Sequence, residues 1–330
     1  MKDNKMKVIV TGGAGFIGSA MVWAFNQKGI NDILIVDHLG DNTEKWKNLR
    51  KLKYTDYLER EKFIEQIEDG AFDECGFDVI VHLGACSSTT QTDCSYLVHN
   101  NFEFSKALAI YADENNARFI YASSAATYGD GEKGFDDDDQ TSESLVPLNM
   151  YGYSKQMFDN WMRQTGLLDK AVACKFFNVF GPNEYHKGSM RSFILKSYEQ
   201  IKETGKVKLF KSYNPDYKDG EMLRDFVYVK DIVQMIMHFV DNKELHGIYN
   251  MGTGKARNWN DLVKATFKAM GLEPNIEYIE MPLSIRNQYQ YFTEAKMEKL
   301  KAAGYNKPTY SLEDAITDYV QNYLMKNERL

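Results

Sequence analysis

The chain has 330 residues, 43% of them hydrophobic and 26% charged, a composition typical of a globular protein rather than of a disordered or collagen-like one. Forty Lys and Arg against 47 Asp and Glu leave a net charge of −7, so the chain lacks the positive field that holds nucleic acid or an anionic membrane. We therefore expect neither partner. No apolar run approaches the ~18 residues of a membrane span, and the first residues lack a signal-peptide core, which predicts a cytoplasmic protein with free cysteines.

The first half of the chain alternates short apolar runs with helix-length amphipathic stretches, which is typical of a doubly wound parallel sheet. We predict strands at 7–11, 32–37, 79–83, 118–123 and 172–177. We predict helices at 16–28, 96–115 and 151–165. The expected fold is therefore α/β, a Rossmann-type parallel sheet with a smaller α/β domain for the substrate.

The second half is less regular. After residue 182 we predict a helix at 189–204, strands at 206–210, 226–229 and 247–251, and a polar loop at 213–220. We expect interleaved domains: residues 1–177 plus about 226–254 bind a dinucleotide, and about 178–225 and 255–330 mainly bind the substrate. The acidic run Asp136–Asp139 lacks EF-hand spacing, so we interpret it as a solvated loop and predict no metal site.

Glycines at 12, 15 and 18 follow the first predicted strand and open the first predicted helix. Glycine permits a tight turn and a close approach of the backbone to a pyrophosphate, while the helix N-terminus supplies unpaired N–H donors. An acid, Asp37, ends the second strand 19 residues beyond Gly18. A strand, a helix and an acid in these places together predict a dinucleotide site.

The residues around Asp37 leave the choice of cofactor open. A carboxylate at the end of the second strand accepts hydrogen bonds from the adenosine ribose, which favours NAD. Five cations then fall within nine positions, where a ribose 2′-phosphate would project: Lys45, Lys47, Arg50, Lys51 and Lys53. They indicate either NADP or a solvated basic helix face, so we expect NADP with NAD as the alternative.

A tyrosine and a lysine four residues apart begin the helix at 151–165. Tyr151 and Lys155 share a helical face, and a nearby ammonium favours the phenolate form of tyrosine. Ser124 directly follows the strand predicted at 118–123, at the carboxyl edge of the sheet, where ligands of such folds bind. We interpret Tyr151 and Lys155 as a general acid/base pair, and Ser124 as a hydrogen-bonding partner of a substrate hydroxyl or carbonyl.

With these motifs in this order, the chain resembles the extended short-chain dehydrogenase/reductases that act on nucleotide sugars. The resemblance implies hydride transfer at a nicotinamide, a catalytic triad of Ser124, Tyr151 and Lys155, and contact of Lys155 with the nicotinamide ribose. The most similar branch inverts C6 of an ADP-linked heptose with NADP. The segments that carry this likeness are 84–90, 122–129, 151–155, 178–182, 186–190, 224–229 and 250–254.

The likeness also implies a set of binding residues. It places the cofactor against Gly12, Gly15, Phe16, Ile17, Gly18, Asp37, His38, Lys45, Arg60, Leu83, Gly84, Ala85, Cys86, Ser87, Asn100, Lys155 and Val179. It places the ADP-sugar against Ser87, Asn178, Lys187, Ser189, Lys196, Phe210, Arg224 and Tyr289. It further implies a homo-oligomer, a pentamer. Two segments, 41–47 and 213–223, look longer than usual in the family.

The likeness makes Lys187 a second catalytic base beside Tyr151. Inversion of an unactivated carbinol needs oxidation to a ketone, reorientation of the ketone and return of the hydride to its other face. The carbonyl oxygen then points elsewhere, so a second residue must return the proton. The alternative for Lys187 is diphosphate binding, and we interpret the neighbouring His186 as structural.

Other functions remain open on the same fold. A 4,6-dehydratase carries an Asp-Glu pair after the catalytic serine or threonine, where this chain has Ala125 and Ala126, so dehydration is disfavoured. A 4-epimerase or a simple reductase stays possible. A catalytically silent NADP-sensing regulator is disfavoured because Ser124, Tyr151 and Lys155 are all present.

Overall fold

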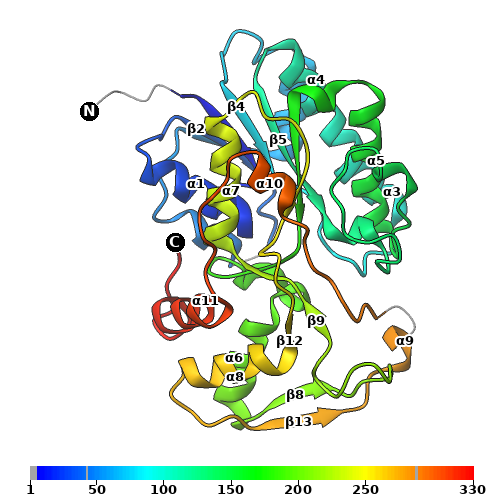
Figure 1. Cartoon of the computed structure of the whole chain (residues 1–330). Helices are drawn as coiled ribbons and strands as arrows, with labels where there is room; N and C mark the ends of the chain where they lie inside the picture. The colour runs from blue at the N-terminus through cyan, green and yellow to red at the C-terminus, as the bar shows by residue number, and fades with distance from the viewer. Residues whose placement is uncertain (1–5, 42–43, 287–288) are drawn as a thin grey trace.

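The computed structural model describes residues 6–41, 44–286 and 289–330. Its centre is a seven-stranded sheet in the order β11-β6-β5-β4-β1-β2-β3 (Figure 1), and each neighbouring pair is parallel. The strands are β1 (Val8–Thr11), β2 (Ile33–Asp37), β3 (Asp56–Glu59), β4 (Val79–His82), β5 (Arg118–Ser124), β6 (Ala171–Phe176) and β11 (Gly247–Met251). The predicted Rossmann-type sheet is confirmed, although β3 was not predicted.

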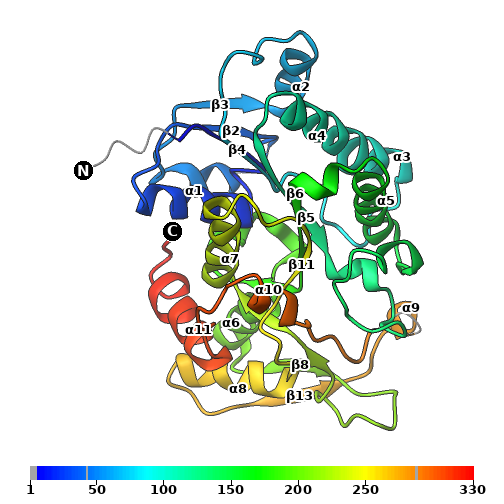
Figure 2. The same ribbon diagram turned by 45° about the horizontal axis from the view of Figure 1, so that its top comes forward.

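Helices cover both faces of the sheet (Figure 2). They are α1 (Phe16–Gln27), α2 (Arg60–Glu68), α3 (Cys94–Leu97), α4 (Phe104–Glu114), α5 (Met150–Gln164) and α7 (Val229–Asp241). Successive side chains of a strand point to opposite faces, so Val8 and Val10 pack in the core beneath α1 and α7. Ile9, between them, packs in the core beneath α4 and α5. This is why the strand sequences are apolar throughout.

The helix predicted at 96–115 is interrupted. A π-helical turn at Val98–Glu103 separates α3 from α4. The turn carries Asn101, whose side chain accepts from the Cys86 N–H at 2.8 Å and donates to the Cys86 carbonyl at 3.0 Å. Such single π-turns often mark functional sites, and this one holds the segment after β4 in place.

A smaller lobe lies below the carboxyl ends of the strands in Figure 1. Its helices are α6 (Phe193–Thr204), α8 (Trp259–Ala269), α9 (Leu283–Arg286) and α11 (Leu312–Asp318). Its strands pair as β8 (Val207–Phe210) with β13 (Ile276–Ile279), β9 (Leu223–Arg224) with β12 (Arg257–Asn258), and β7 (Asn178–Phe180) with β10 (Phe226–Tyr228). The short helix α10 (Glu298–Ala302) instead lies beside α7 in Figure 1 and packs against β11 of the large sheet. The domain boundaries given above stay a prediction. No helix in the described ranges is long and apolar enough to cross a membrane.

The acidic run at 136–139 is only in part the solvated loop we predicted: Asp138 is exposed, but Asp137 and Asp139 bind backbone donors. Asp137 is buried, and its carboxylate accepts the Asn250 N–H at 2.8 Å. Asp139 accepts the Ile248 N–H at 2.7 Å and pairs with Lys299 at 2.8 Å. Both N–H groups belong to β11 at the edge of the sheet. The acids thus satisfy backbone donors that an edge strand would leave unpaired.

Candidate active site

The glycine loop lies where the strand order reverses, between β1 and β4. A Cβ atom on Gly12, whose φ is +67°, would lie 2.7 Å from the Gly84 backbone nitrogen, and one on Gly18 would lie 2.0 Å from the Gly12 carbonyl oxygen. Both positions therefore require glycine. Helix α1 begins directly after the loop, at Phe16, so its N-terminal N–H donors face the crevice in which such folds bind a dinucleotide.

A cavity of about 560 Å³ opens in front of this loop. Its walls come from the glycine loop, the carboxyl ends of β2, β4 and β5, the first turns of α5, and residues 176–190. The structure brings these predicted site residues together along it: Gly12, Gly15, Phe16, Ile17, Gly18, Asp37, Lys45, Leu83, Gly84, Ala85, Cys86, Ser87, Ser124, Tyr151, Lys155, Asn178, Val179 and Lys187. A cleft of this size with converging polar groups suits a dinucleotide and a second ligand.

A close helix-to-loop contact brings the predicted triad together. The Asn149 side chain caps α5 by accepting the Gly152 N–H at 2.9 Å, so the helix begins at Met150. A Cβ on Gly152 would lie 2.7 Å from the Ala126 carbonyl oxygen. Only glycine therefore lets α5 approach the turn after Ser124 this closely. Tyr151 and Ser124 are close enough as a result for the Ser124 hydroxyl to lower the pKa of Tyr151 through a hydrogen-bonding contribution.

The pKa values of the pair are governed by burial. Burial raises the pKa of Tyr151, and the hydrogen bond from Ser124 offsets this only in part. Burial also lowers the pKa of Lys155 to about 8, while Asp159 and Cys86 favour its charged form. Our prediction that Lys155 lowers the pKa of Tyr151 is wrong for this arrangement, because desolvation of the phenol dominates.

A buried polar network supports the serine strand and α5. The Asp159 carboxylate, one helical turn after Lys155, accepts from the Ser123 hydroxyl at 2.6 Å. Lys175 on β6 lies 3.6 Å from the same carboxylate and donates to the Thr127 hydroxyl at 2.8 Å. Buried charges are retained where they are paired and hydrogen-bonded, as here. Sequence reasoning missed this network, because only the sheet brings its members together.

Lys187 borders the cavity from a short 3₁₀ helix (Tyr185–Met190), which is interrupted at Gly188. Its ammonium lies 5.4 Å from the centroid of the Phe16 ring. Within the part of the chain that the structure describes, this ammonium has no hydrogen-bond or ion-pair partner. Burial lowers the pKa of Lys187, although the nearby Glu184 carboxylate favours its charge. A lysine in this setting can exchange a proton.

Asp37 is held by donors of the chain itself. One carboxylate oxygen accepts the Ala14 N–H at 2.8 Å. The other accepts the His38 N–H at 2.7 Å and pairs with the Lys45 ammonium at 2.5 Å. The acid that we predicted as a ribose ligand is therefore neutralised by one of the cations that we predicted at a 2′-phosphate.

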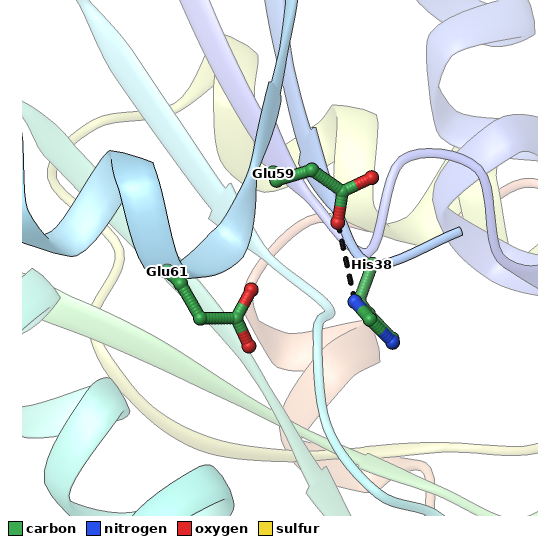
Figure 3. Close-up of side chains that lie close together, drawn as sticks. All are labelled: His38, Glu59 and Glu61. Atoms are coloured by element: carbon green, nitrogen blue, oxygen red, sulfur yellow. Dashed lines mark hydrogen bonds and ion pairs between the residues drawn. The ribbon is translucent and has the colours of Figure 1, made fainter. Parts of the chain in front are cut away.

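Three predicted cofactor residues are not part of the cavity wall. Figure 3 shows His38 with its Nδ1 3.2 Å from the Glu59 carboxylate, and Arg60 is paired with Glu61. The ligand-type atoms of His38, Glu59 and Glu61 lie within 4.8 Å of one another, but these groups are exposed or partly exposed, and the absence of a metal site stays a prediction. Asn100 is buried and donates to the Asn101 side chain at 2.8 Å.

The remaining predicted substrate residues lie farther into the smaller lobe. Phe210 and Tyr289 line a second cavity of about 210 Å³, with Phe193 and Trp259. The Arg224 guanidinium lies 5.2 Å from the centroid of the Tyr289 ring. Ser189 is exposed, and its carbonyl accepts from the Lys196 ammonium at 2.6 Å. The structure thus places Ser87, Asn178 and Lys187 on the larger cavity and Phe210 and Tyr289 on the second, while Ser189, Lys196 and Arg224 line neither of these two cavities.

Several cavity residues were not predicted. Ser88, Ala122, Ser123, Phe176, Phe177, His186 and Met190 also line the larger cavity. Most of them are neighbours of predicted residues, so their position beside a motif was the available signal. His186 is partly buried, and burial lowers its pKa to about 4, which agrees with an uncharged, structural imidazole.

Comparison with known proteins places the chain in a family. Residues 8–252 match the NAD dependent epimerase/dehydratase family. An ADP-L-glycero-D-manno-heptose-6-epimerase of Nitratidesulfovibrio vulgaris is 54% identical over 96% of this chain and 97% of its own. One of Fusobacterium nucleatum is 49% identical over 97% and 99%. The crystal structure of a Helicobacter pylori ADP-L-glycero-D-manno-heptose-6-epimerase matches with a TM-score of 0.80, at 27% identity over 96% of both chains.

The chain therefore belongs to the NAD dependent epimerase/dehydratase family. The resemblance predicted from the motifs is confirmed, and so is the enzyme class, an isomerase of the epimerase type. A nicotinamide cofactor agrees with the family and with the geometry of the glycine loop.

Proposed function

We propose that the protein inverts C6 of ADP-D-glycero-D-manno-heptose to give ADP-L-glycero-D-manno-heptose, by oxidation to a ketone and reduction on the other face. The full-length relatives at 49–54% identity support the substrate. The single observation that carries the mechanism is that Tyr151 and Lys187 border one cavity from two separate elements. A bound nicotinamide would supply the exchange of a hydride.

In this proposal Tyr151 and Lys187 handle protons on opposite faces of the ketone. Tyr151 takes the proton from the C6 hydroxyl, with Ser124 donating a hydrogen bond to the same oxygen. Lys155 orients the nicotinamide ribose. After the ketone has turned, Lys187 returns a proton to its oxygen. The lowered pKa of Lys187 supports this role, because proton exchange near neutral pH is easier for such a group.

We propose that the second cavity holds the adenine of the substrate. Flat aromatic rings favour stacking against Phe210 and Tyr289. Arg224 lies beside them and presents a fork of donors suited to a diphosphate. Asn178 and Ser87, on the wall of the larger cavity, would then face the sugar, with Ser189 and Lys196 as further contacts of the ADP-sugar.

We propose NADP as the preferred cofactor. The Lys45 ammonium neutralises Asp37 at 2.5 Å, which removes the repulsion that a free carboxylate would exert on a 2′-phosphate. His38 and Arg60 have acidic partners too, but of these three cations only Lys45 lines the larger cavity, so it is the cation on which the proposal rests. A homopentamer and a cytoplasmic location stay predictions of the resemblance and of the sequence.

The deciding experiment uses a substrate that carries deuterium at C6. Purified protein with NADP should convert ADP-D-glycero-D-manno-heptose to an equilibrium mixture of the two C6 epimers, resolved by chromatography. The label should stay on C6, because the hydride leaves and returns without exchange. UDP-glucose is the matched control for a 4-epimerase. Conversion of UDP-glucose with no change in the ADP-heptose, or exchange of the label with solvent, would contradict the proposal.

A further inference from the structure

The last described residues lie against the nucleotide-binding half of the molecule. Figures 1 and 2 both show the end of the chain rising from α11 toward α1. The Arg329 side chain is 6% exposed. Its guanidinium donates to the Asn48 side-chain oxygen at 3.2 Å and to the Glu44 carboxylate at 2.7 Å. It also lies 4.7 Å from the centroid of the Tyr185 ring.

Asn48 connects this arginine to two parts of the candidate active site. Its side chain is buried, and its Nδ2 donates to the Ala14 carbonyl and to the Asn183 carbonyl, both at 3.0 Å. Ala14 belongs to the glycine loop, and its N–H holds Asp37. Asn183 begins the turn that leads to Lys187. One amide therefore joins the loop that faces the diphosphate to the segment that carries the proposed second base.

The same turn is tied to the chain end by further bonds. The Leu330 N–H donates to the Asn183 side-chain oxygen at 3.1 Å, and the Tyr185 hydroxyl donates to the Glu328 carbonyl at 2.9 Å. Asn183 also donates to the Ser19 hydroxyl on α1 at 2.9 Å. On the other side of the arginine, Glu44 immediately precedes Lys45, the partner of Asp37.

We infer that Arg329 is a positioning residue that fixes the relative positions of three segments of the active site: the glycine loop, residues 44–48 and the turn that carries Lys187. It acts through Asn48 and Glu44 and touches neither reacting group. Its planar fork of donors suits this bridging task, which a single ammonium cannot reproduce. Loss of the fork should loosen the nucleotide side and the Lys187 side together. The roles of Lys45 and Lys187 in this inference rest on the proposed function.

The test compares Arg329→Met with Glu328→Gln. The first keeps the length of the side chain and removes every donor. The second removes the exposed ion pair between the neighbouring residue and Lys51, without contact to Asn48. We expect Arg329→Met to raise the Kd for NADP by about tenfold, and to lower kcat for ADP-heptose at least tenfold with a smaller change in KM, as expected of a transition-state effect. Arg329→Lys should recover only part of each loss, and Glu328→Gln should change neither.

Asn48→Asp separates positioning from general stability. It keeps the oxygen that accepts from Arg329 and removes the donor to Ala14 and Asn183, so it should reproduce both losses while the guanidinium stays paired. If Arg329→Met does not fold, Asn48→Asp still tests the inference, because it breaks the link between Arg329 and the two active-site segments. Nucleotide affinity and kcat within twofold of the unmodified protein, in either folded variant, would overturn the inference. If the unmodified protein does not turn over ADP-heptose, the proposed function fails, while the nucleotide affinities still test Arg329.

Discussion

The ammonium of Lys175 lies 3.6 Å from the carboxylate of Asp159, and both side chains are closed off from solvent. Burial opposes the charge on each group, raising the pKa of Asp159 and lowering that of Lys175, while each favours the charge of the other. The pair joins α5 to β6, and its carboxylate also accepts from the Ser123 hydroxyl. Removal of either charge should therefore destabilise this part of the fold.

Lys175→Met should lower the free energy of unfolding by about 3–5 kcal/mol, because it leaves a buried carboxylate without its counter-ion. Asp159→Asn should cost a similar amount by isolating the ammonium. The double variant should lose clearly less than the sum of the two. Urea unfolding of the four proteins measures this coupling, and strictly additive losses would contradict it.

His82 should make the fold sensitive to acid. Its ring nitrogens lie 2.6 Å from the Thr11 hydroxyl and 2.8 Å from the Ser105 hydroxyl. Burial, and after it the Lys155 charge, lowers the pKa of His82 to about 3. An unfolded histidine takes up a proton near pH 6.5, so the unfolded state binds more protons between pH 6.5 and 3. Stability contributed by the neutral ring is therefore lost as the pH falls through this window.

His82→Gln keeps a donor and an acceptor but cannot take up the proton. Between pH 7 and pH 4.5, we expect its free energy of unfolding to fall by about 2–3 kcal/mol less than that of the unmodified protein, from about 1.4 kcal/mol for each pH unit below 6.5. Urea titrations at both pH values give the two differences. Equal falls in the two proteins would show that His82 does not carry this acid sensitivity.

Lys45→Ala should weaken NADP selectively. The unmodified protein should bind NADP more tightly than NAD. The substitution removes the counter-ion of Asp37 at 2.5 Å, so the ratio of the two affinities should fall at least tenfold, about 1.4 kcal/mol. Lys62→Ala on the exposed side of α2 is the matched control. Isothermal titration measures all the affinities, and equal binding of both cofactors by the unmodified protein would refute the NADP proposal.

Tyr151→Phe should lower the rate of epimerisation by roughly 10² to 10⁴, the usual contribution of a general acid/base. The ring and its packing stay, so cofactor binding should survive. Tyr153→Phe, two residues along the same helix and 50% exposed, should leave the rate unchanged. Near-normal turnover by the first variant would mean that another residue carries the proton.

Lys187→Met tests the two-base scheme. The variant should lose epimerisation, yet with Tyr151 it should still dismutate an analogue that carries an aldehyde at C6, oxidising one molecule and reducing the next. A lysine used only to bind the diphosphate would mainly raise KM. The measurement is kcat at saturating ADP-heptose, with Lys202→Met on the exposed side of α6 as control. A fall in kcat of less than about tenfold, ~1.4 kcal/mol of barrier, would show that Lys187 binds the diphosphate and is not a catalytic base.

Sequence patterns predicted those parts of the molecule that depend on neighbouring residues. Five strands were predicted for the large sheet, at 7–11, 32–37, 79–83, 118–123 and 172–177. Each begins and ends within one residue of the observed strand, because uninterrupted apolar runs signal strands buried on both faces. The glycine loop and the spacing of Tyr151 and Lys155 are likewise local. The start of α6 was wrong by four residues: Gly188 has a φ of +53°, and the Ser192 hydroxyl caps the helix by accepting the Leu195 N–H at 3.4 Å.

Contacts between distant parts of the chain had no such signal. Asp137 resembles a solvated acid in the sequence, but the fold buries it against the backbone of β11, 113 residues away. Asn48 and Arg329 are 281 residues apart and meet only because the chain end returns to the nucleotide-binding half. A hydrogen bond or ion pair forms where folding has already brought two groups within about 3 Å and excluded water. Which charges are neutralised at the active site is therefore decided by packing, and the residue types alone leave it open.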